Sequence, residues 1–189
     1  MDTEDRLEFF KEELSLIINP VIREFTEECI KIAPDYIFED CPSSSSGKFH
    51  PLEELGPDGT LIHMKKVFAL AYDLSIGLGC DSHRDEVCAA ALLHDLAKQG
   101  KDKTGHTTSD HPQVMASIAA DVYRQKFKGR LSRDSANMIC SAIFYHYGPW
   151  TDQSVRKPLS KYTPEELVVY IADYISSKRF VQIDYKRGL

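Results

Sequence analysis

The sequence has no surplus of positive charge and no long apolar run. Its 189 residues carry a formal net charge of -6, whereas proteins that hold long nucleic acid usually present a basic face. No run of about eighteen apolar residues occurs, so no membrane span is expected. The first residues, MDTED, are acidic and lack an apolar signal region. We therefore expect a cytoplasmic protein with neither long nucleic acid nor a membrane as a partner.

Cysteine is scarce and scattered. The five cysteines are odd in number and form no C-x-x-C pair, which argues against a disulfide framework and a cysteine zinc knuckle. We expect reduced thiols in the core. Internal repeats, long charge runs and strand-like alternation are also absent. A chain of this length suits one domain, made of N-terminal helices over residues 1–33, a loop over 34–59 and a helical core over 60–180.

Helical periodicity dominates what is present. Residues 4–18 place apolar side chains on one stripe that ends at Asn19-Pro20, and a second helix is expected to run to Ile32. Residues 34–59 show no sustained period and are rich in proline, serine and glycine. Such a segment is too long for a plain connector in a compact domain, so it is either disordered or functional.

Five further helices are predicted after this loop. They are expected to begin near Thr60, Ser82, Pro112, Ser132 and Thr163. The second of them is expected to start with a capping-box-like pair, Ser82 and Asp85, and to end near Gly100. Each of the five carries histidine or aspartate along its apolar stripe: His63, His94 with Asp95, His111, His146 and Asp173.

The adjacent pair His94-Asp95 lies in the apolar stretch VCAAALLHDLA at residues 87–97. A buried, unpaired carboxylate is costly, so something must compensate the pair. A single core histidine usually has only a hydrogen-bonding role, but six ionisable groups on five helices are better explained by shared cations. Imidazole and carboxylate without thiolate suit Fe, Mn, Ni, Co or Zn, with Mg as a further candidate. Six ligands exceed the need of one catalytic ion, so two divalent ions are expected.

This order of residues, a histidine, a His-Asp pair and a late aspartate on successive helices, resembles the HD-domain superfamily of metal-dependent phosphohydrolases. The resemblance implies an all-α HD-domain helical bundle. The loop over residues 34–59, called the serine-rich loop below, is expected near the site. The resemblance also implies that the metal ligands are His63, His94, Asp95 and Asp173. Members with two more histidines between the pair and the last aspartate resemble dinuclear enzymes, and His111 and His146 occupy those places.

Two narrower resemblances cover different parts of the sequence, and only the first implies a substrate. The segments LLHDLAK at 92–98, AIFYH at 142–146 and ADYI at 172–175 are similar to bacterial HD hydrolases that split dinucleoside tetraphosphates symmetrically. The segments PSSSSGKFHP at 42–51 and HYGPW at 146–150 instead resemble phage-type and prokaryotic HD hydrolases. Lys98 completes an HD-x-x-K pattern, which also occurs in nucleases.

Candidate roles follow from the side-chain chemistry. Asp95 has two oxygens and can bridge two ions, and a hydroxide held between the ions would attack phosphorus in line. Lys98 either contacts a phosphate oxygen or the nucleophile, or is a solvated lysine that ends its helix. The serine-rich loop is either a phosphate-binding segment or mobile surface, and Trp150 either stacks on a base or covers the core. The candidate substrate-binding residues are Ser45, Ser46, Lys48, Trp150 and Arg179.

These features predict a phosphohydrolase that cleaves a phosphoester or phosphoanhydride bond of a nucleotide or dinucleotide. A small phosphorylated substrate is the expected partner, and self-association into a homo-oligomer is left open. One alternative is an HD nuclease acting on single-stranded RNA or DNA, which would need a basic groove with stacking aromatics. Another is a nucleotide-binding module without turnover. The complete set of candidate ligands favours an enzyme.

Overall fold

The computed structural model describes residues 2–44 and 46–186, and within these ranges it contains helices and turns but no β-strand. This confirms the all-α class. The buried core runs without interruption from the N-terminal helices to the last helix. No helix in the described ranges is long and apolar enough to cross a bilayer.

The N-terminal part contains three helices: α1 (Thr3–Phe9), α2 (Lys11–Leu16) and α3 (Pro20–Lys31). The single helix expected over residues 4–18 is wrong, because the chain breaks at Phe10, whose backbone leaves the helical region with φ -107° and ψ 14°. The Phe10 side chain is fully buried, so core packing takes precedence over a continuous helix. The Asn19 side chain accepts hydrogen bonds from the first turn of α3, as an N-cap does.

The described residues between α3 and α4 (Gly59–Gly77) are joined to the core at several points. This segment contains two short 3₁₀ turns, η1 (Asp35–Phe38) and η2 (Leu52–Leu55), and most of η1 is buried. Backbone hydrogen bonds fasten it at Ser43, whose N–H donates to Glu54, and at Cys41, which bonds with Pro57 and Thr60. These bonds hold the serine-rich loop beside the start of α4.

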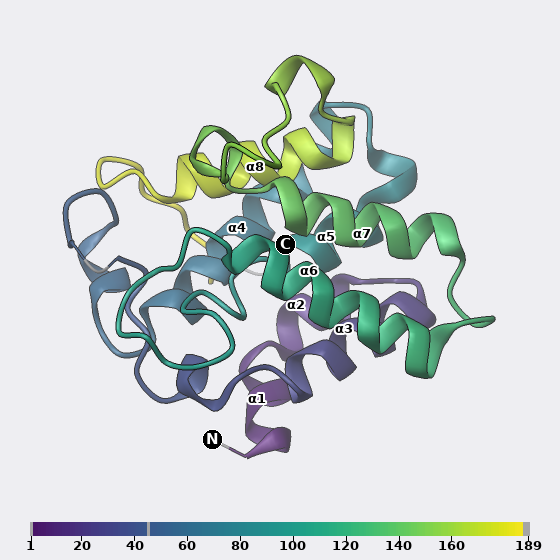
Figure 1. Ribbon diagram of the computed structural model, residues 1–189, viewed down its shortest axis with the longest axis horizontal. Helices are drawn as coiled ribbons and strands as arrows, with labels where there is room; N and C mark the ends of the chain where they lie inside the picture. Colours follow the sequence, from purple (N-terminus) through teal and green to yellow (C-terminus); the bar gives the residue numbers. More distant parts are fainter. Residues whose placement is uncertain (1, 45, 187–189) are drawn as a thin grey trace.

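Three helices form the centre of the bundle: α4, α5 (Arg84–Leu93) and α8 (Pro164–Ser176). Helix α5 is buried from Glu86 to Leu93 and packs against both α4 and α8. Figure 1 shows α5 in the middle of the molecule, with the other helices arranged around it. Helix α8 begins with a capping box between Thr163 and Glu166, as the sequence predicts.

Helix α5 is shorter than expected at both ends. A 3₁₀ turn, η3 (Asp81–His83), precedes it, and Asp85 does not cap it but accepts the backbone N–H groups of Ile18 and Asn19. At the other end, N–H groups of residues 96 and 98 bond to carbonyls only three residues earlier. The pair His94-Asp95 therefore lies in a tight turn at the C-terminal end of α5 rather than inside the helix.

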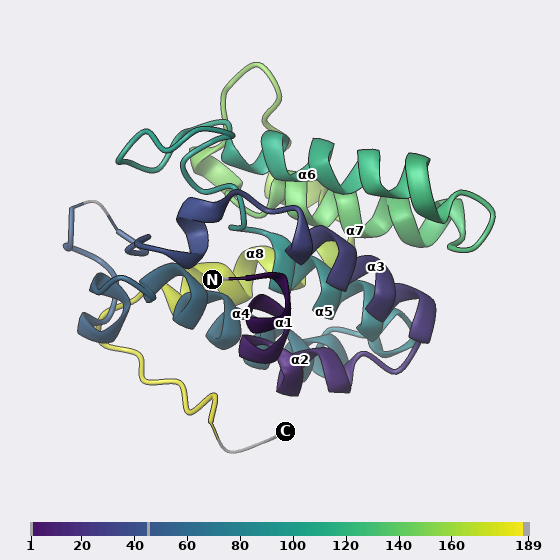
Figure 2. The same ribbon diagram turned by 90° about the horizontal axis from the view of Figure 1, so that it is seen from below.

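The remaining helices are α6 (His111–Val122), continued by a π-helical turn η4 (Tyr123–Phe127), and α7 (Arg133–Tyr145), with short turns η5 (Gly148–Trp150) and η6 (Leu159–Lys161) before α8. Helices α6 and α7 lie side by side in both ribbon views (Figure 2). Gly148 follows α7 with a φ of +54°, and a Cβ there would meet the Tyr170 ring at 2.3 Å. Only glycine fits that turn.

Candidate metal centre

Six ionisable side chains from five helices meet in the interior. His63 comes from α4, His94 and Asp95 from the end of α5, and His111 from the first residue of α6. His146 is the residue that ends α7, and Asp173 lies in α8. All six are buried except Asp173, whose side chain is 19% exposed. Residues up to 110 positions apart in the sequence thus share one small volume.

Asp95 lies at the centre of this cluster, and its two oxygens face different neighbours. Oδ2 lies 3.5 Å from Nε2 of His94 and 4.0 Å from Nε2 of His63. Oδ1 lies 3.2 Å from Nε2 of His111 and 3.7 Å from Nε2 of His146. The carboxylate therefore separates the histidines into two pairs, one on each oxygen.

Asp173 completes the first of these pairs. Its Oδ1 accepts a hydrogen bond of 2.9 Å from Nε2 of His63 and lies 3.9 Å from Nε2 of His94. Among the described residues, Asp95 is the carboxylate within ion-pair distance of the second pair, and the Nε2 atoms of His111 and His146 lie 3.1 Å apart.

Every histidine of the cluster turns Nε2 inward, and its Nδ1 faces an oxygen outside the cluster. Three of them place Nδ1 at hydrogen-bonding distance from the carbonyl three residues earlier: His94 to Ala91 at 2.7 Å, His111 to Thr108 at 2.6 Å, and His146 to Ile143 at 2.7 Å. Nδ1 of His63 instead faces Oε2 of Glu54, 3.2 Å away. A hydrogen bond from the outer ring nitrogen is the usual way to orient a metal-ligating imidazole.

The two aspartates stay ionised although they are enclosed. Burial alone would raise the pKa of Asp95, but the Lys98 ammonium and the neighbouring imidazoles hold that pKa well below its usual value. Burial would also raise the pKa of Asp173, and the hydrogen bond from His63 outweighs it and lowers the pKa. Two negative charges therefore persist inside the cluster.

The histidines respond to this environment in opposite directions. Burial lowers the pKa of His94, and burial together with the neighbouring imidazoles lowers the pKa of His146 to about 3. Burial also acts to lower the pKa of His63, but Asp173 and Glu54 outweigh it and raise the pKa to about 9. Neutral imidazoles such as His94 and His146 have a lone pair free for a cation.

The donor atoms fit a divalent cation. Nε2 of His94 and Oδ1 of Asp95 are buried and have no hydrogen-bond partner within the described residues. His111 and His146 also direct two Nε2 atoms at each other, although each ring places its Nδ1 at a carbonyl, where the proton belongs. A bound cation would accept the lone pairs of the unpartnered atoms, and it would also explain why the two Nε2 atoms face each other. Two triads within the cluster lie close enough to share an ion: His63, His94 and Asp173, and His94, Asp95 and His146. A third triad of this kind, His50, Glu54 and His63, lies beside the cluster.

Lys98 follows Asp95 by three residues in the same tight turn. Its side chain is buried, and its ammonium contacts Oδ2 of Asp95 directly. Burial acts to lower the pKa of Lys98, but the Asp95 charge outweighs it and raises the pKa. The lysine is therefore a buried cation at the edge of the cluster, not the solvated helix end that was the alternative.

The cluster opens into a cavity of about 400 Å³. Asp95, Lys98, His111, His146 and Asp173 line one part of it. The remaining lining comes from the serine-rich loop, from aromatic residues after α7 and from the end of α8: Ser43, Ser44, Ser46, Phe49, His50, Thr107, Tyr147, Trp150, Tyr174, Ser177 and Lys178. Both aspartates and two of the four histidines of the cluster are thus reachable from the cavity.

The candidate substrate residues lie at different distances from this cavity. Ser46 and Trp150 line it. Lys48 and Arg179 are exposed and are not among its lining residues. Ser45 lies outside the described residues.

Sequence reasoning missed Glu54 and Tyr174. Glu54 is fully buried against His63 and His50, and Tyr174 stacks on Trp150 at a ring distance of 5.8 Å. Glu54 lies in a segment without periodicity, so nothing local marks it. The one local signal for Tyr174 is its position directly after Asp173.

The fold and the cluster agree with the family comparison. The HD domain family model matches residues 60–178, which is more than half of the chain, and the chain therefore belongs to the HD domain family. HD domains bind divalent metals, and membership indicates a metal-dependent phosphohydrolase. Searches of curated proteins and of solved structures each found no match to this chain.

Proposed function

We propose that the protein hydrolyses a phosphoester or phosphoanhydride bond of a nucleotide or dinucleotide, using two divalent cations. The observation that carries this proposal is the opening of the His/Asp cluster into a cavity with aromatic walls. Its volume of about 400 Å³ lies within the range of about 300–1,000 Å³ that is usual for small-molecule sites. A site of this size favours a small substrate over a long polymer.

The proposed cation ligands are His63, His94, Asp95, His111, His146 and Asp173. The number two is supported by the division at Asp95, because each oxygen faces its own pair of imidazoles. The ligand types favour Fe, Mn, Ni, Co or Zn, with Mg as a further candidate. When bound, such cations lower the pKa of a coordinated water and offset charge on phosphate oxygens.

The protein's own residues would orient the phosphate. Lys98 holds its ammonium against Asp95 and also lines the cavity, so it can fix the carboxylate and attract a phosphate oxygen. Lys178 also lines the cavity, with its ammonium 3.7 Å from the centre of the Tyr174 ring. Two lysines in the lining of one cavity suit a substrate that carries several phosphate charges.

The aromatic wall supports a nucleoside as the rest of the substrate. Ring contacts continue from His111 to Tyr147 at 4.8 Å, from Tyr147 to Trp150 at 6.3 Å and from Trp150 to Tyr174 at 5.8 Å. Trp150 remains 53% exposed. An exposed indole that lines the same cavity as the candidate metal ligands can stack on the base of a bound nucleotide.

The test is elemental analysis of the purified protein, followed by metal exchange and a substrate panel. The panel contains nucleoside monophosphates, deoxynucleoside triphosphates, diadenosine tetraphosphate and a single-stranded oligonucleotide, each assayed with Mn, Co, Ni, Zn, Fe and Mg. We expect turnover of at least one nucleotide or dinucleotide. Turnover of the oligonucleotide alone would assign a nuclease instead, and tight nucleotide binding without product in every metal would assign a binding module.

A further inference from the structure

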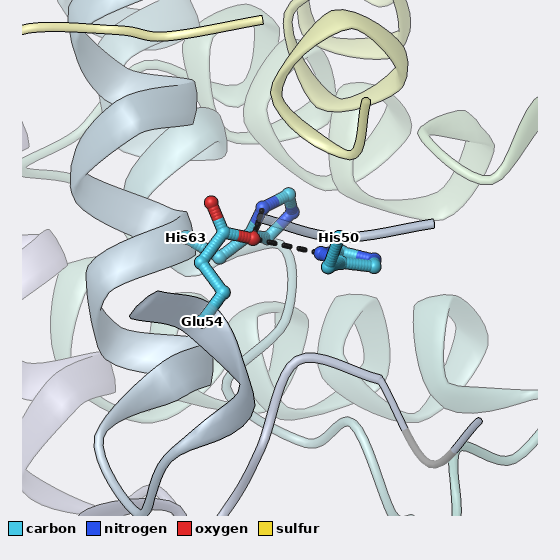
Figure 3. Close-up of side chains that lie close together, drawn as sticks. All are labelled: His50, Glu54 and His63. Carbon is cyan, nitrogen blue, oxygen red and sulfur yellow. Dashed lines mark hydrogen bonds and ion pairs between the residues drawn. The ribbon is translucent and has the colours of Figure 1, made fainter. Parts of the chain in front are cut away.

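Glu54 is a buried carboxylate outside the six-residue cluster that contacts three basic side chains. It belongs to the turn η2 and is fully buried. Oε1 accepts a hydrogen bond of 2.8 Å from the Lys66 ammonium. Oε2 lies 2.7 Å from Nδ1 of His50 and 3.2 Å from Nδ1 of His63 (Figure 3). One carboxylate oxygen thus faces two imidazoles.

The trio of His50, Glu54 and His63 does not fit a cation of its own. A neutral imidazole has one nitrogen that can bind a cation and one that carries hydrogen, so His63 cannot serve both this trio and the six-residue cluster. Lys66 is itself buried and already supplies a positive charge to the carboxylate. The inner nitrogen of His63 is directed at Asp173, so the nitrogen facing Glu54 is its outer one.

His63 needs such an outer partner more than the other histidines do. His94 and His146 end their helices, where carbonyls of the last turn lack regular partners and can accept from a side chain. His63 lies inside the 19-residue helix α4, where carbonyls accept N–H groups four residues further on. An acceptor for its Nδ1 must therefore come from outside the helix, and Glu54 is the carboxylate that reaches it.

We propose that Glu54 is a positioning residue that holds two imidazoles, turning Nε2 of His63 toward the cation and His50 toward the substrate cavity. The inference rests on the proposed metal-dependent function and adds how one ligand is oriented. Glu54 keeps the proton of His63 on Nδ1, which leaves Nε2 as the ligand atom. Through His50, which lines the cavity, it also joins the serine-rich loop to the metal centre.

The chain offers a matched control for this role. Glu53 also contacts the Lys66 ammonium, but its side chain is 59% exposed, and among the described residues no hydrogen bond or ion pair joins it to His50 or His63. Glu53→Gln therefore removes one partner of the lysine without touching the imidazoles. Glu54→Gln leaves a single acceptor atom, which cannot serve Lys66 and the histidines together. Glu54→Asp keeps the buried charge and withdraws the oxygens from the imidazoles.

The experiment titrates Zn²⁺ and Mn²⁺ into metal-stripped wild type and the three variants by competition with a chelating dye. We expect Glu54→Gln and Glu54→Asp to weaken binding of at least one cation about tenfold or more, while Glu53→Gln stays within about twofold. Equal affinity of the wild type and the Glu54 variants would overturn the positioning role alone. A wild type that binds neither cation would overturn the proposed function together with it.

A second measurement needs no variant and so covers the case in which both Glu54 variants fail to fold. Nitrogen-15 NMR of zinc-loaded wild type reports which ring nitrogen of His63 carries hydrogen. We expect a protonated Nδ1 and a metal-bound Nε2. A His63 ring bound to zinc through Nδ1, or one without hydrogen on Nδ1, would overturn the proposal.

Discussion

Asp95 lies 3.2 Å from Nε2 of His111 through one carboxylate oxygen and directs its other oxygen away, toward His94. The side chain is 2% exposed and enclosed by imidazoles and one ammonium. A single carboxylate that faces two groups of nitrogen donors is well placed to be shared by two cations. Substitution of Asp95 should therefore affect both cations, whereas substitution of His111 should affect one.

Asp95→Asn should remove bound metal and turnover while the protein stays helical. The amide has nearly the same volume but offers one uncharged oxygen, so it cannot supply an oxygen ligand to each of two cations. We expect activity at least about a hundredfold lower, since the substitution removes charge directly beside the reacting group. Metal content by elemental analysis and helicity by circular dichroism check this. Wild-type turnover in the folded variant would contradict the role of Asp95.

His111→Ala should remove about one ion of two. His111 faces Oδ1 of Asp95 and His146, and it has no contact with the triad of His63, His94 and Asp173. The ion held by that triad should therefore remain. The exposed His106 provides the control, and His106→Ala should keep the wild-type metal content. An unchanged ion count in His111→Ala would make this histidine a substrate contact in a mononuclear site.

Much of the fold could be predicted because its signals are local. The capping box from Thr163 to Glu166 and the Ser132 cap are short-range patterns, and both begin helices where expected. The break at Phe10 and the early end of α5 could not be predicted, because they depend on burial against distant helices. Asp85 shows the same limit, since its partners lie 66 and 67 residues away.

The residues of the candidate site also differ in whether a local sequence pattern marks them. The sequence pattern assigns His63, His94 and Asp173 each to an apolar helical stripe, so periodicity indicated that they point inward. Glu54 lies in an aperiodic segment, and its role depends on a contact with α4 that only the folded chain creates. The aromatic contact between Trp150 and Tyr174 likewise joins the turn after α7 to α8.

The stability of the metal-free protein should fall as pH rises from about 6.5 to about 9. His63 has a pKa of about 9 in the folded protein against an ordinary value of 6.5. Its proton therefore stabilises the fold fully below 6.5, and this contribution is lost as pH rises through the folded pKa. Thermal melts in chelator at pH 6.5, 7.5 and 8.5 check this. We expect a loss of a few kcal/mol at most.

Melts of the cation-loaded protein provide the comparison for this pH effect. When Nε2 of His63 binds a cation it carries no proton, so the same decline should be absent. The pKa of His146 is lowered to about 3, so this residue makes the stability of the fold rise with pH instead, and only below pH 6.5. A flat metal-free profile between pH 6.5 and 8.5 would show that His63 does not hold the extra proton.

Trp150→Ala should weaken turnover of a nucleotide without affecting an inorganic substrate. The indole lines the cavity, is 53% exposed and stacks on Tyr174 with an angle of 17° between the rings. Stacking of one base on an aromatic side chain contributes about 1–3 kcal/mol. We therefore expect kcat/KM for the nucleotide to fall about tenfold or more. Tripolyphosphate has no base, so its kcat/KM should stay within about twofold of wild type.

The control for Trp150 is Phe180→Ala. Phe180 is 86% exposed and is not among the residues that line the cavity, so its removal should leave kcat/KM unchanged for both substrates. An equal loss for nucleotide and tripolyphosphate in Trp150→Ala would mean that the indole supports the shape of the site rather than a base. An unchanged kcat/KM for both would remove Trp150 from the substrate site, and the base would have to contact Phe49 or Tyr147 instead.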